Sequence, residues 1–360
     1  MKTIPSSGAG HPLVSLGIFL IVVASVAVMA GCAPISIEIW DWYDLDAIRD
    51  NMRGSYILMD DLDSTTAGYE ELASPTANEG KGWQPIGSMA VNDTFAGSFD
   101  GQGYEIRDLF IDRPDESDVG LLGVIGEGGI IDNVGALVNG DVTGYGAVGS
   151  LVGYNRGSVR NSYACSAVTG NLNVGSVVGL NGGTVSSSYS GGNVTGGDAV
   201  GGLVGKNEGT VSNSYSTGAV SGNYFVGDLV GLNGGTVSNS YTGGTVNGSD
   251  FVGGLVGRNE GAVSKCYSTG GVTGDEYAGG LVGQNRHGVV GNSVWDTQTS
   301  GQPTSGGGIG KTTAEMQDIT TFTRMGWDIV AVANSGAHNT NYIWNIVDDV
   351  TCPFLSWQPV

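Results

Sequence analysis

The sequence is poor in the residues that usually supply metal ligands, crosslinks or positive charge. Its 360 residues include four cysteines, nine prolines and three histidines, and no His-Glu-x-x-His zinc motif occurs. Without a Gly-x-y triplet pattern, the 65 glycines do not indicate collagen. Lys and Arg number 14 against 35 Asp and Glu, a net charge of −21. This balance argues against nucleic acid or an anionic lipid surface as the partner.

Long apolar runs are confined to the first 32 residues. One early charge, Lys2, precedes an apolar run from Leu13 to Ala30, which ends in Met-Ala-Gly before Cys32. Such a run predicts an export segment, and small residues before a cysteine resemble the lipobox of bacterial lipoproteins. Cys32 is therefore the predicted lipid-attachment site. The alternative is an uncleaved anchor, because the run is about long enough to span a bilayer. Both interpretations place the rest of the chain outside the cytoplasmic membrane.

What the sequence has in abundance is a strict repeat. Leu203-Val-Gly-Lys-Asn207 is one of a series of similar units, and a tyrosine follows most of the asparagines by eight residues. A constant period without insertions indicates that each unit is one coil stacked on the next. The asparagines stand 26 residues apart, at Asn155, Asn181, Asn207, Asn233, Asn259 and Asn285.

Within each unit, β-branched and aromatic runs alternate with Gly, Asn and Ser. The unit from Thr210 to Gly235 has three such runs and no helical apolar period, which predicts three short strands per coil. We therefore predict an all-β protein, a right-handed parallel β-helix with small helical or irregular caps. The asparagine column is explained by turn amides that hydrogen-bond along the axis, without any ligand.

Four segments follow from these patterns. Residues 1–32 are the export segment, 33–141 an acidic N-terminal cap with irregular first coils, 142–294 the regular repeats, and 295–360 a C-terminal cap. In the acidic segment, Asp44 to Gly54 predicts a short amphipathic helix with Asp44 as its N-cap and Gly54 as its end.

The acidic charge is concentrated before the repeats. Segment 33–141 has 22 acidic and five basic residues, against seven and six in residues 142–294. Asp60, Asp61 and Asp63 are candidate calcium ligands, but their spacing does not match an EF-hand. A solvated acidic turn is the favoured interpretation, so no cofactor is predicted and calcium remains the alternative.

The repeat ends with a one-residue insertion at Arg286-His287, which replaces the next tyrosine by Val294-Trp295. Residues 306–312 resemble a phosphate-binding loop, but Ser305 stands where that loop needs its first glycine. Thr312-Thr-Ala-Glu315 instead predicts a capping box that starts a helix. The tryptophans at 327, 344 and 357 are expected to form the C-terminal cap.

The remaining cysteines are not expected to form disulfides. Cys165 and Cys266 are 101 residues apart, almost four coils, which is beyond disulfide reach at about 4.8 Å per coil. Cys266 occupies a position that other coils give to serine, so we expect a small inward-facing side chain.

The Leu-Val-Gly-x-Asn units resemble the GLUG repeat of bacterial surface proteins, which also occurs in the non-catalytic part of some immunoglobulin A peptidases. The resemblance includes the segment Phe95 to Ile111 and the tail from Trp295 to Trp357. It implies a surface-exposed structural unit, and the peptidase association is not carried over to this chain.

Two classes of function remain. The first is a non-enzymatic, adhesin-like module, exported to the cell surface, lipid-anchored and able to bind a glycan or a protein. The second is a carbohydrate-active enzyme, a polysaccharide lyase or hydrolase, which needs paired carboxylates, or acids with a neighbouring Arg or Lys, facing one groove. The charged pairs of the coils, Lys206 with Glu208 and Arg258 with Glu260, are predicted to be surface salt bridges. Asp228 is the one isolated acid that merits a catalytic test.

Overall fold

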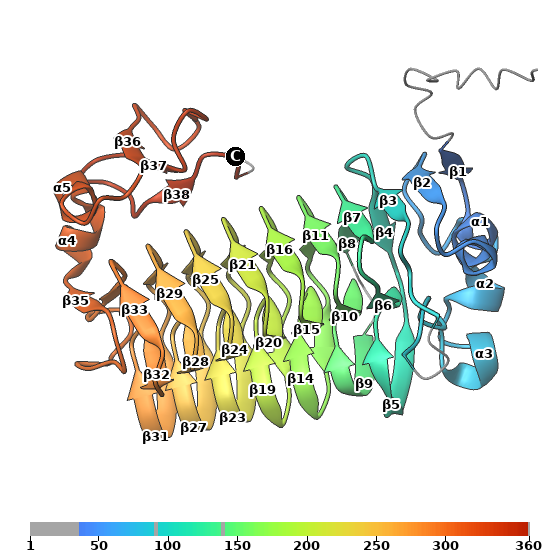
Figure 1. Ribbon diagram of the computed structural model, residues 1–360, viewed down its shortest axis with the longest axis horizontal. Coiled ribbons are helices and arrows are strands. Elements are labelled where there is room, and N and C mark those ends of the chain that lie inside the picture. The colour runs from blue at the N-terminus through green and yellow to red at the C-terminus, as the bar shows by residue number, and fades with distance from the viewer. Residues whose placement is uncertain (1–35, 90–92, 138–140, 359–360) are drawn as a thin grey trace, which may run out of the picture. The chain divides into compact units, whose positions relative to one another are not determined.

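Residues 36–89, 93–137 and 141–358 are described by a computed structural model, in which the chain winds into a parallel β-solenoid of about seven turns (Figure 1). Cys32 and the predicted export segment lie outside the described residues. The strands of successive coils stack into four parallel sheets, which we name A to D. The all-β solenoid and its 26-residue spacing are thus as the sequence predicts.

The four sheets draw one strand, or one pair of short strands, from each coil. Sheet A consists of β1 (Ile37–Ile39), β2 (Ser55–Leu58), β3 (Ser98–Asp100), β7 (Ile130–Asp132), β11 (Ser158–Arg160), β16 (Thr184–Ser186), β21 (Thr210–Ser212), β25 (Thr236–Ser238), β29 (Ala262–Ser264) and β33 (Val289–Gly291). Sheet B consists of β4 (Glu105–Arg107), β8 (Gly135–Leu137), β12 (Tyr163–Ala164), β17 (Tyr189–Ser190), β22 (Tyr215–Ser216), β26 (Tyr241–Thr242), β30 (Tyr267–Ser268), β34 (Val294–Asp296) and β35 (Ile309–Lys311).

Sheets C and D complete each coil. Sheet C consists of β5 (Ile111–Val119), β9 (Asp141–Val148), β13 (Ala167–Thr169), β14 (Leu172–Gly175), β18 (Val194–Thr195), β19 (Asp198–Gly201), β23 (Val220–Gly227), β27 (Val246–Gly253) and β31 (Val272–Gly279). Sheet D consists of β6 (Leu122–Ile125), β10 (Val152–Asn155), β15 (Val178–Asn181), β20 (Val204–Asn207), β24 (Val230–Asn233), β28 (Val256–Asn259) and β32 (Val282–Asn285).

The prediction of three strands per coil is wrong, because the regular coils have four. The strand that the sequence does not reveal belongs to sheet B, where Tyr215–Ser216 is only two residues long. Two residues between turn-forming residues carry no alternating pattern that could distinguish a strand from a turn. Sheet C adds a second irregularity, since the long strands β9 and β23 each pair with two shorter ones.

The register of the stack is constant through the regular coils. Lys206 pairs with Leu232, and Asn207 with Asn233, so each residue lies beside the residue 26 positions later. At the last coil the offset becomes 27, since Tyr267 pairs with Val294. The insertion near His287, whose φ is 66°, produces this change and places a valine where the tyrosine column would continue.

The core consists mainly of valine and leucine columns that point inward from sheets A, C and D and their flanking turns, whereas the regular coils of sheet B direct Ala, Ser or Thr inward. In the repeated Leu-Val-Gly-x-Asn frame, the glycine allows sheet D to approach sheet C closely. A Cβ on Gly205 would lie 2.4 Å from the backbone carbon of Asn173, a distance that no real Cβ contact reaches. Glycine is therefore required in this column by packing, independently of any ligand.

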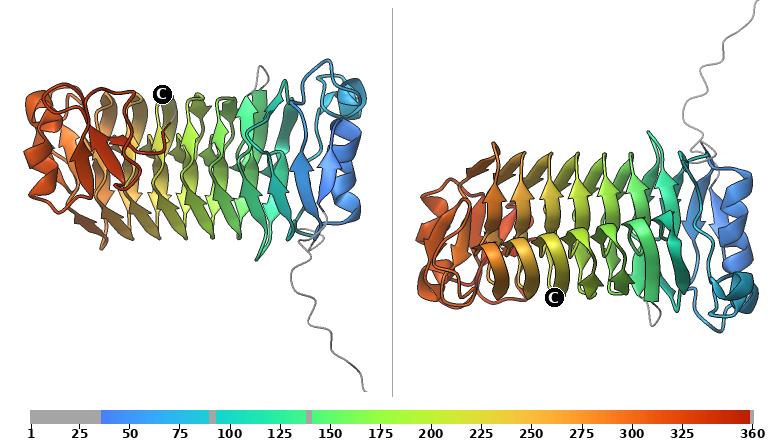
Figure 2. Two further views of the ribbon diagram at one scale, coloured as in Figure 1. Left: turned by 90° about the horizontal axis from the view of Figure 1, so that it is seen from above. Right: turned by 90° about the horizontal axis from the view of Figure 1, so that it is seen from below.

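Helices close the N-terminal end (Figures 1 and 2). Trp42 packs there against Tyr69 and Trp83. The predicted helix is shorter and begins earlier than expected: α1 spans Trp42–Asp46, is capped by Asp41 and continues as the 3₁₀ turn η1 (Ala47–Asp50). The cap is Asp41 because its carboxylate accepts the Asp44 N–H, and Asp44 itself is inside the helix. The short helical turns α2 (Tyr69–Leu72) and α3 (Ala77–Gly80) follow.

The C-terminal segment turns back over sheet B (Figures 1 and 2). Its helix α4 (Thr313–Gln317) starts at the predicted capping box, in which the Thr312 and Glu315 side chains each accept the other's backbone N–H. Helix α5 (Ile319–Thr323) and a small sheet follow. That sheet consists of β36 (Ile329–Ala331), β37 (Trp344–Ile346) and β38 (Phe354–Leu355).

Deletion of one complete coil should be tolerated. Removing Asn207 to Leu232 joins Lys206 to Asn233 and keeps every column in register, at the loss of about one coil interface. Removing only the 13 residues from Asn207 to Ala219 places strands beside turns and leaves buried backbone groups unpaired, each costing about 1–3 kcal/mol. We expect a cooperative thermal melt and a β-type circular dichroism spectrum for the first variant, and aggregation for the second. Similar behaviour of the two variants would contradict a 26-residue coil.

Candidate functional site

The six predicted asparagines lie in one column at the ends of the sheet D strands. From Asn155 to Asn259, each Nδ2 donates to the Oδ1 of the next asparagine, at distances of 2.7–2.8 Å. These five side chains have no exposed surface. The same amides also approach the carbonyl of the turn that follows, as Asn207 does with Gly209 at 3.3 Å. From Asn155 to Asn259 the column therefore holds coils together and offers no ligand an accessible amide.

A second column of short polar side chains lies between sheets A and B. The Oγ of Ser214 accepts the backbone N–H of Ser188 at 3.2 Å and donates to the carbonyl of Ser212 at 2.7 Å. In the last regular coil this position is Cys266, which is fully buried, as the sequence predicts. Burial raises the pKa of the Cys266 thiol to about 12, so the sulfur is an unreactive neutral thiol.

Asp228 is enclosed in the interior rather than in a surface groove. It is fully buried, accepts the Ser216 hydroxyl at 2.8 Å and accepts the Gly244 N–H at 2.7 Å. Glycine at positions 202 and 244 leaves the space that the carboxyl group fills. Burial raises the pKa of Asp228 to about 8, so this acid is mostly neutral at pH 7. It cannot touch a polysaccharide on the surface without local unfolding.

The raised pKa of Asp228 predicts a pH-dependent stability that Asp228→Asn should remove. The folded state favours the protonated form of the Asp228 carboxyl group. Its contribution to the free energy of unfolding is therefore complete below the ordinary carboxyl pKa of 3.8 and is lost as the pH rises to about 8. The loss is about 1.4 kcal/mol per pH unit in that interval. Since Asn resembles the protonated acid, the variant should match the wild type near pH 4 and exceed its unfolding free energy near pH 8.

Denaturant unfolding at several pH values measures this difference. The exposed acid Asp275 provides a control, because Asp275→Asn should leave the pH dependence as it is in the wild type. Parallel stability curves for Asp228→Asn and the wild type would show that Asp228 is ionised in the folded protein.

The predicted salt bridges of the coils are present. Lys206 Nζ lies 2.8 Å from Glu208 Oε1, and Arg258 Nη2 lies 2.5 Å from Glu260 Oε1. Arg258 is less exposed than expected, because its guanidinium also lies over the Phe225 ring at 5.1 Å. Lys206 and Arg258 are thus both paired with acidic side chains of the protein itself.

Asp61 and Asp63, two of the candidate calcium ligands, also interact with other side chains of the protein. Asp61 pairs with Arg107 at 3.1 Å, and the Asp63 carboxylate accepts hydrogen bonds from Thr65. Among the described residues, no group of three His, Cys, Asp or Glu side chains is arranged to hold a metal ion. The solvated acidic turn stays the prediction for this segment, with calcium binding as its alternative.

The tyrosines of sheet B form a stack that the C-terminal cap covers in part. Neighbouring rings are 4.8–5.0 Å apart and nearly parallel. Trp357 packs on Tyr215 and donates from its indole N–H to the carbonyl of Asn213. Trp344 packs on the next two tyrosines, so the cap buries this face of the last coils. The stack comprises Tyr163, Tyr189, Tyr215, Tyr241 and Tyr267.

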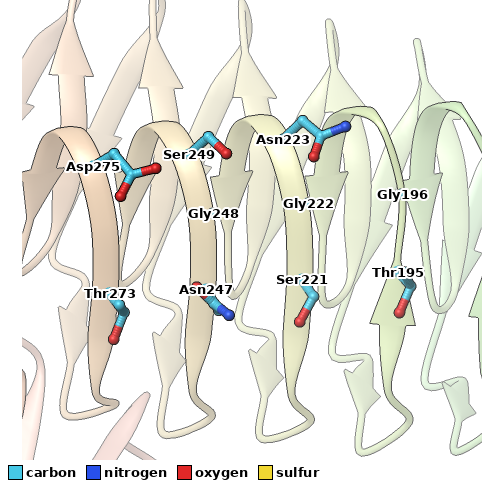
Figure 3. Close-up of a pocket in the computed structure, with 10 residues that line it drawn as sticks. All are labelled: Thr195, Gly196, Ser221, Gly222, Asn223, Asn247, Gly248, Ser249, Thr273 and Asp275. Carbon is cyan, nitrogen blue, oxygen red and sulfur yellow. The ribbon is translucent and has the colours of Figure 1, made fainter.

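The candidate site is an open groove of about 340 Å³ on the outer face of sheet C (Figure 3). Its floor is a column of glycines at positions 196, 222 and 248. A Cβ on Gly222 would approach the Val200 and Val226 methyl groups to 2.8 and 3.0 Å, so core packing excludes a side chain here. Figure 3 shows one polar row on each side of this floor: Thr195, Ser221, Asn247 and Thr273 on one side, and Asn223, Ser249 and Asp275 on the other.

The sequence contained a signal for this groove that the prediction missed. Glycines recur every 26 residues from position 144 to 274, and Thr, Ser or Asn precedes each of them. A glycine column flanked by hydroxyl and amide side chains indicates an outward polar face whose centre has no side chains. The asparagine column is the more regular pattern in the sequence, but from Asn155 to Asn259 its amides are buried.

Residues 196–221 match the GLUG motif. The chain carries a GLUG repeat. This match covers one coil, from the groove glycine Gly196 to the wall residue Ser221, and the other coils have the same period and register.

Two relatives are similar in sequence to about a third of this chain. A 128-residue stretch, 34% of the chain, is 36% identical to part of halomucin from Haloquadratum walsbyi and covers 1% of that protein. A stretch of 122 residues, 32% of the chain, is 38% identical to part of a Gly-rich membrane protein of Evansella cellulosilytica and covers 13% of it. The chain thus spans only a small fraction of either relative, whose names refer to much longer proteins.

A solved structure has the same fold. It is a crystal structure of a Bacteroides ovatus protein named as an immunoglobulin A1 protease, with a TM-score of 0.56 over 91% of this chain and 93% of that one. At 19% sequence identity, this likeness concerns the fold alone. Within the described ranges, none of the helices is long and apolar enough to cross a membrane.

Proposed function

We propose that this protein is a non-catalytic interaction module, exported and displayed at the cell surface as an adhesin-like solenoid. The observation that carries the proposal is the contrast between its faces. The asparagine and serine columns use their hydrogen bonds between coils, whereas the groove on sheet C directs free polar side chains outward. The names of the two relatives, halomucin and a Gly-rich membrane protein, support a surface or membrane-associated location.

A carbohydrate-active enzyme is the second candidate, and the groove gives it little support. Hydrolysis of a glycosidic bond generally requires two carboxyl groups on opposite sides of the bond. Asp275 is the single acid among the ten lining residues. Asp228, the acid with a raised pKa, faces the interior.

We therefore expect the full chain to release no new reducing ends from a panel of soluble polysaccharides. Cleavage that Asp228→Asn abolishes would favour the enzyme.

The proposal includes membrane attachment through a lipid on Cys32. If acyl chains on this cysteine anchor the protein, Cys32→Ser should move it from the membrane fraction to the soluble fraction, because stable attachment depends on those chains. The wild type should incorporate a labelled fatty acid and should be cleaved by protease added to intact cells.

Two results would change this account. Membrane association that survives Cys32→Ser, with no acyl label on the wild type, would favour the uncleaved anchor over the lipid. Protection of the wild type from external protease, with degradation only after lysis, would contradict surface display itself. Cys165→Ser, a substitution in the solenoid, serves as the matched control and should leave fractionation unchanged.

A further inference from the structure

The polar side chains of the groove on sheet C differ from those of the buried asparagine and serine columns in that they have no partners in the described part of the chain. None of the seven wall residues makes a side-chain hydrogen bond or ion pair with another described residue. The asparagines of the turn column, in contrast, are satisfied by their neighbours. Hydroxyl and amide groups without internal partners are available to hydrogen-bond a ligand.

The side chains of the groove walls favour neutral ligands over anionic ones. Six of the seven wall residues are uncharged, and the seventh is the acid Asp275. No Lys or Arg lines the groove, so phosphate groups of nucleic acids and the carboxylates of anionic polymers would find no positive partner. A ligand with many neutral hydroxyl groups, which both donate and accept hydrogen bonds, matches these walls.

The position of the groove on a sheet face argues against peptides. An extended peptide gains affinity by pairing with free backbone groups at a sheet edge. Here the backbone of β23 is already paired with that of β27, Gly222 beside Gly248. A helical peptide needs an apolar groove, whereas this floor consists of glycine.

Exposed tyrosines follow the groove residues along the chain. Tyr224 directly follows the wall residue Asn223 and is 50% exposed, and Tyr277 lies two residues after Asp275 and is 57% exposed. Such rings combine an apolar face with a polar hydroxyl group, a combination suited to contacts with ligands that have both apolar and hydroxyl-bearing surfaces. Sugar rings are ligands of this kind.

We propose that this groove binds a neutral polysaccharide, with its chain running along the solenoid axis across successive coils. The inference rests on the proposed interaction function and names its ligand class. The repeat supplies a hydroxyl or amide side chain to one wall in each of four coils, from Thr195 to Thr273, and a side chain to the other wall in three of them, so consecutive sugars meet similar contacts. Affinity thus depends on the number of coils engaged.

Calorimetric titration of the full chain with xylan, mannan, dextran and a soluble β-glucan tests the inference, with polygalacturonate as the anionic comparison. We expect binding to at least one neutral polymer and weaker binding to polygalacturonate. The affinity should change little between about 0.05 M and about 0.5 M salt, because no ion pairs are involved. Tighter binding to polygalacturonate, or a steep salt dependence, would overturn the inference.

Paired variants locate the site. Asn223→Ala combined with Asn247→Ala removes one amide from each wall and should weaken binding by about tenfold or more, as expected for the loss of two or more hydrogen bonds. The control combines Thr236→Ala with Ser238→Ala, outward residues of sheet A in the same part of the stack, and should bind as the wild type does. Thermal melts of both variants verify that they fold.

Different results would contradict the groove assignment and the proposed interaction function. Equal affinities for the groove variant and the control would place binding elsewhere and overturn the groove assignment. If the surface-displayed protein binds a protein partner but no neutral polysaccharide, the inference fails while the interaction function stands. If the chain is not displayed outside the cell, the proposed function fails even if the groove binds glucan in the test tube.

Discussion

From Asn155 to Asn259, each asparagine of the turn column donates an amide hydrogen to the next, and this contact forms only between coils of the same length. Asn207, for example, meets Asn233 at 2.8 Å because 26 residues separate them and every strand between them is in register. One hydrogen bond contributes about 1 kcal/mol net, but a buried amide without a partner costs more. The column therefore penalises any insertion or deletion within a coil and keeps the period of the whole stack.

The other surfaces depend on this constant register. Because strands repeat in register, the tyrosines of sheet B stack face to face, and the C-terminal cap can pack on several of them at once. The same register aligns the glycines of sheet C into one floor and the flanking hydroxyl and amide groups into walls. Backbone packing thus determines the dimensions of the groove, and the side chains of its walls determine its polarity.

Much of the architecture could be predicted from the sequence because the repeat places equivalent residues at equal intervals. The coil length, the inward position of Cys266, the paired charges at 206 and 208, and the capping box at Thr312 all follow from local patterns. Features that depend on distant contacts could not be predicted. The two-residue strands of sheet B exist because the strands of neighbouring coils pair with them. The helix cap is a local feature, but Asp41 and Asp44 are both suitable N-cap residues, and the backbone conformation decides for Asp41. The groove was overlooked because glycine is common throughout the chain.

The substitution Asn233→Asp tests the role of the column most directly. It preserves the size of the side chain but replaces the donor to Asn259 by an oxygen, which then faces the Asn259 oxygen in the interior. Asn239→Asp, in the same coil but outside the column, is the matched control. Urea unfolding at neutral pH should show a loss of at least about 2 kcal/mol for Asn233→Asp and little change for Asn239→Asp. Equal unfolding midpoints for the two variants would contradict the claim that the buried amide column holds the coils together.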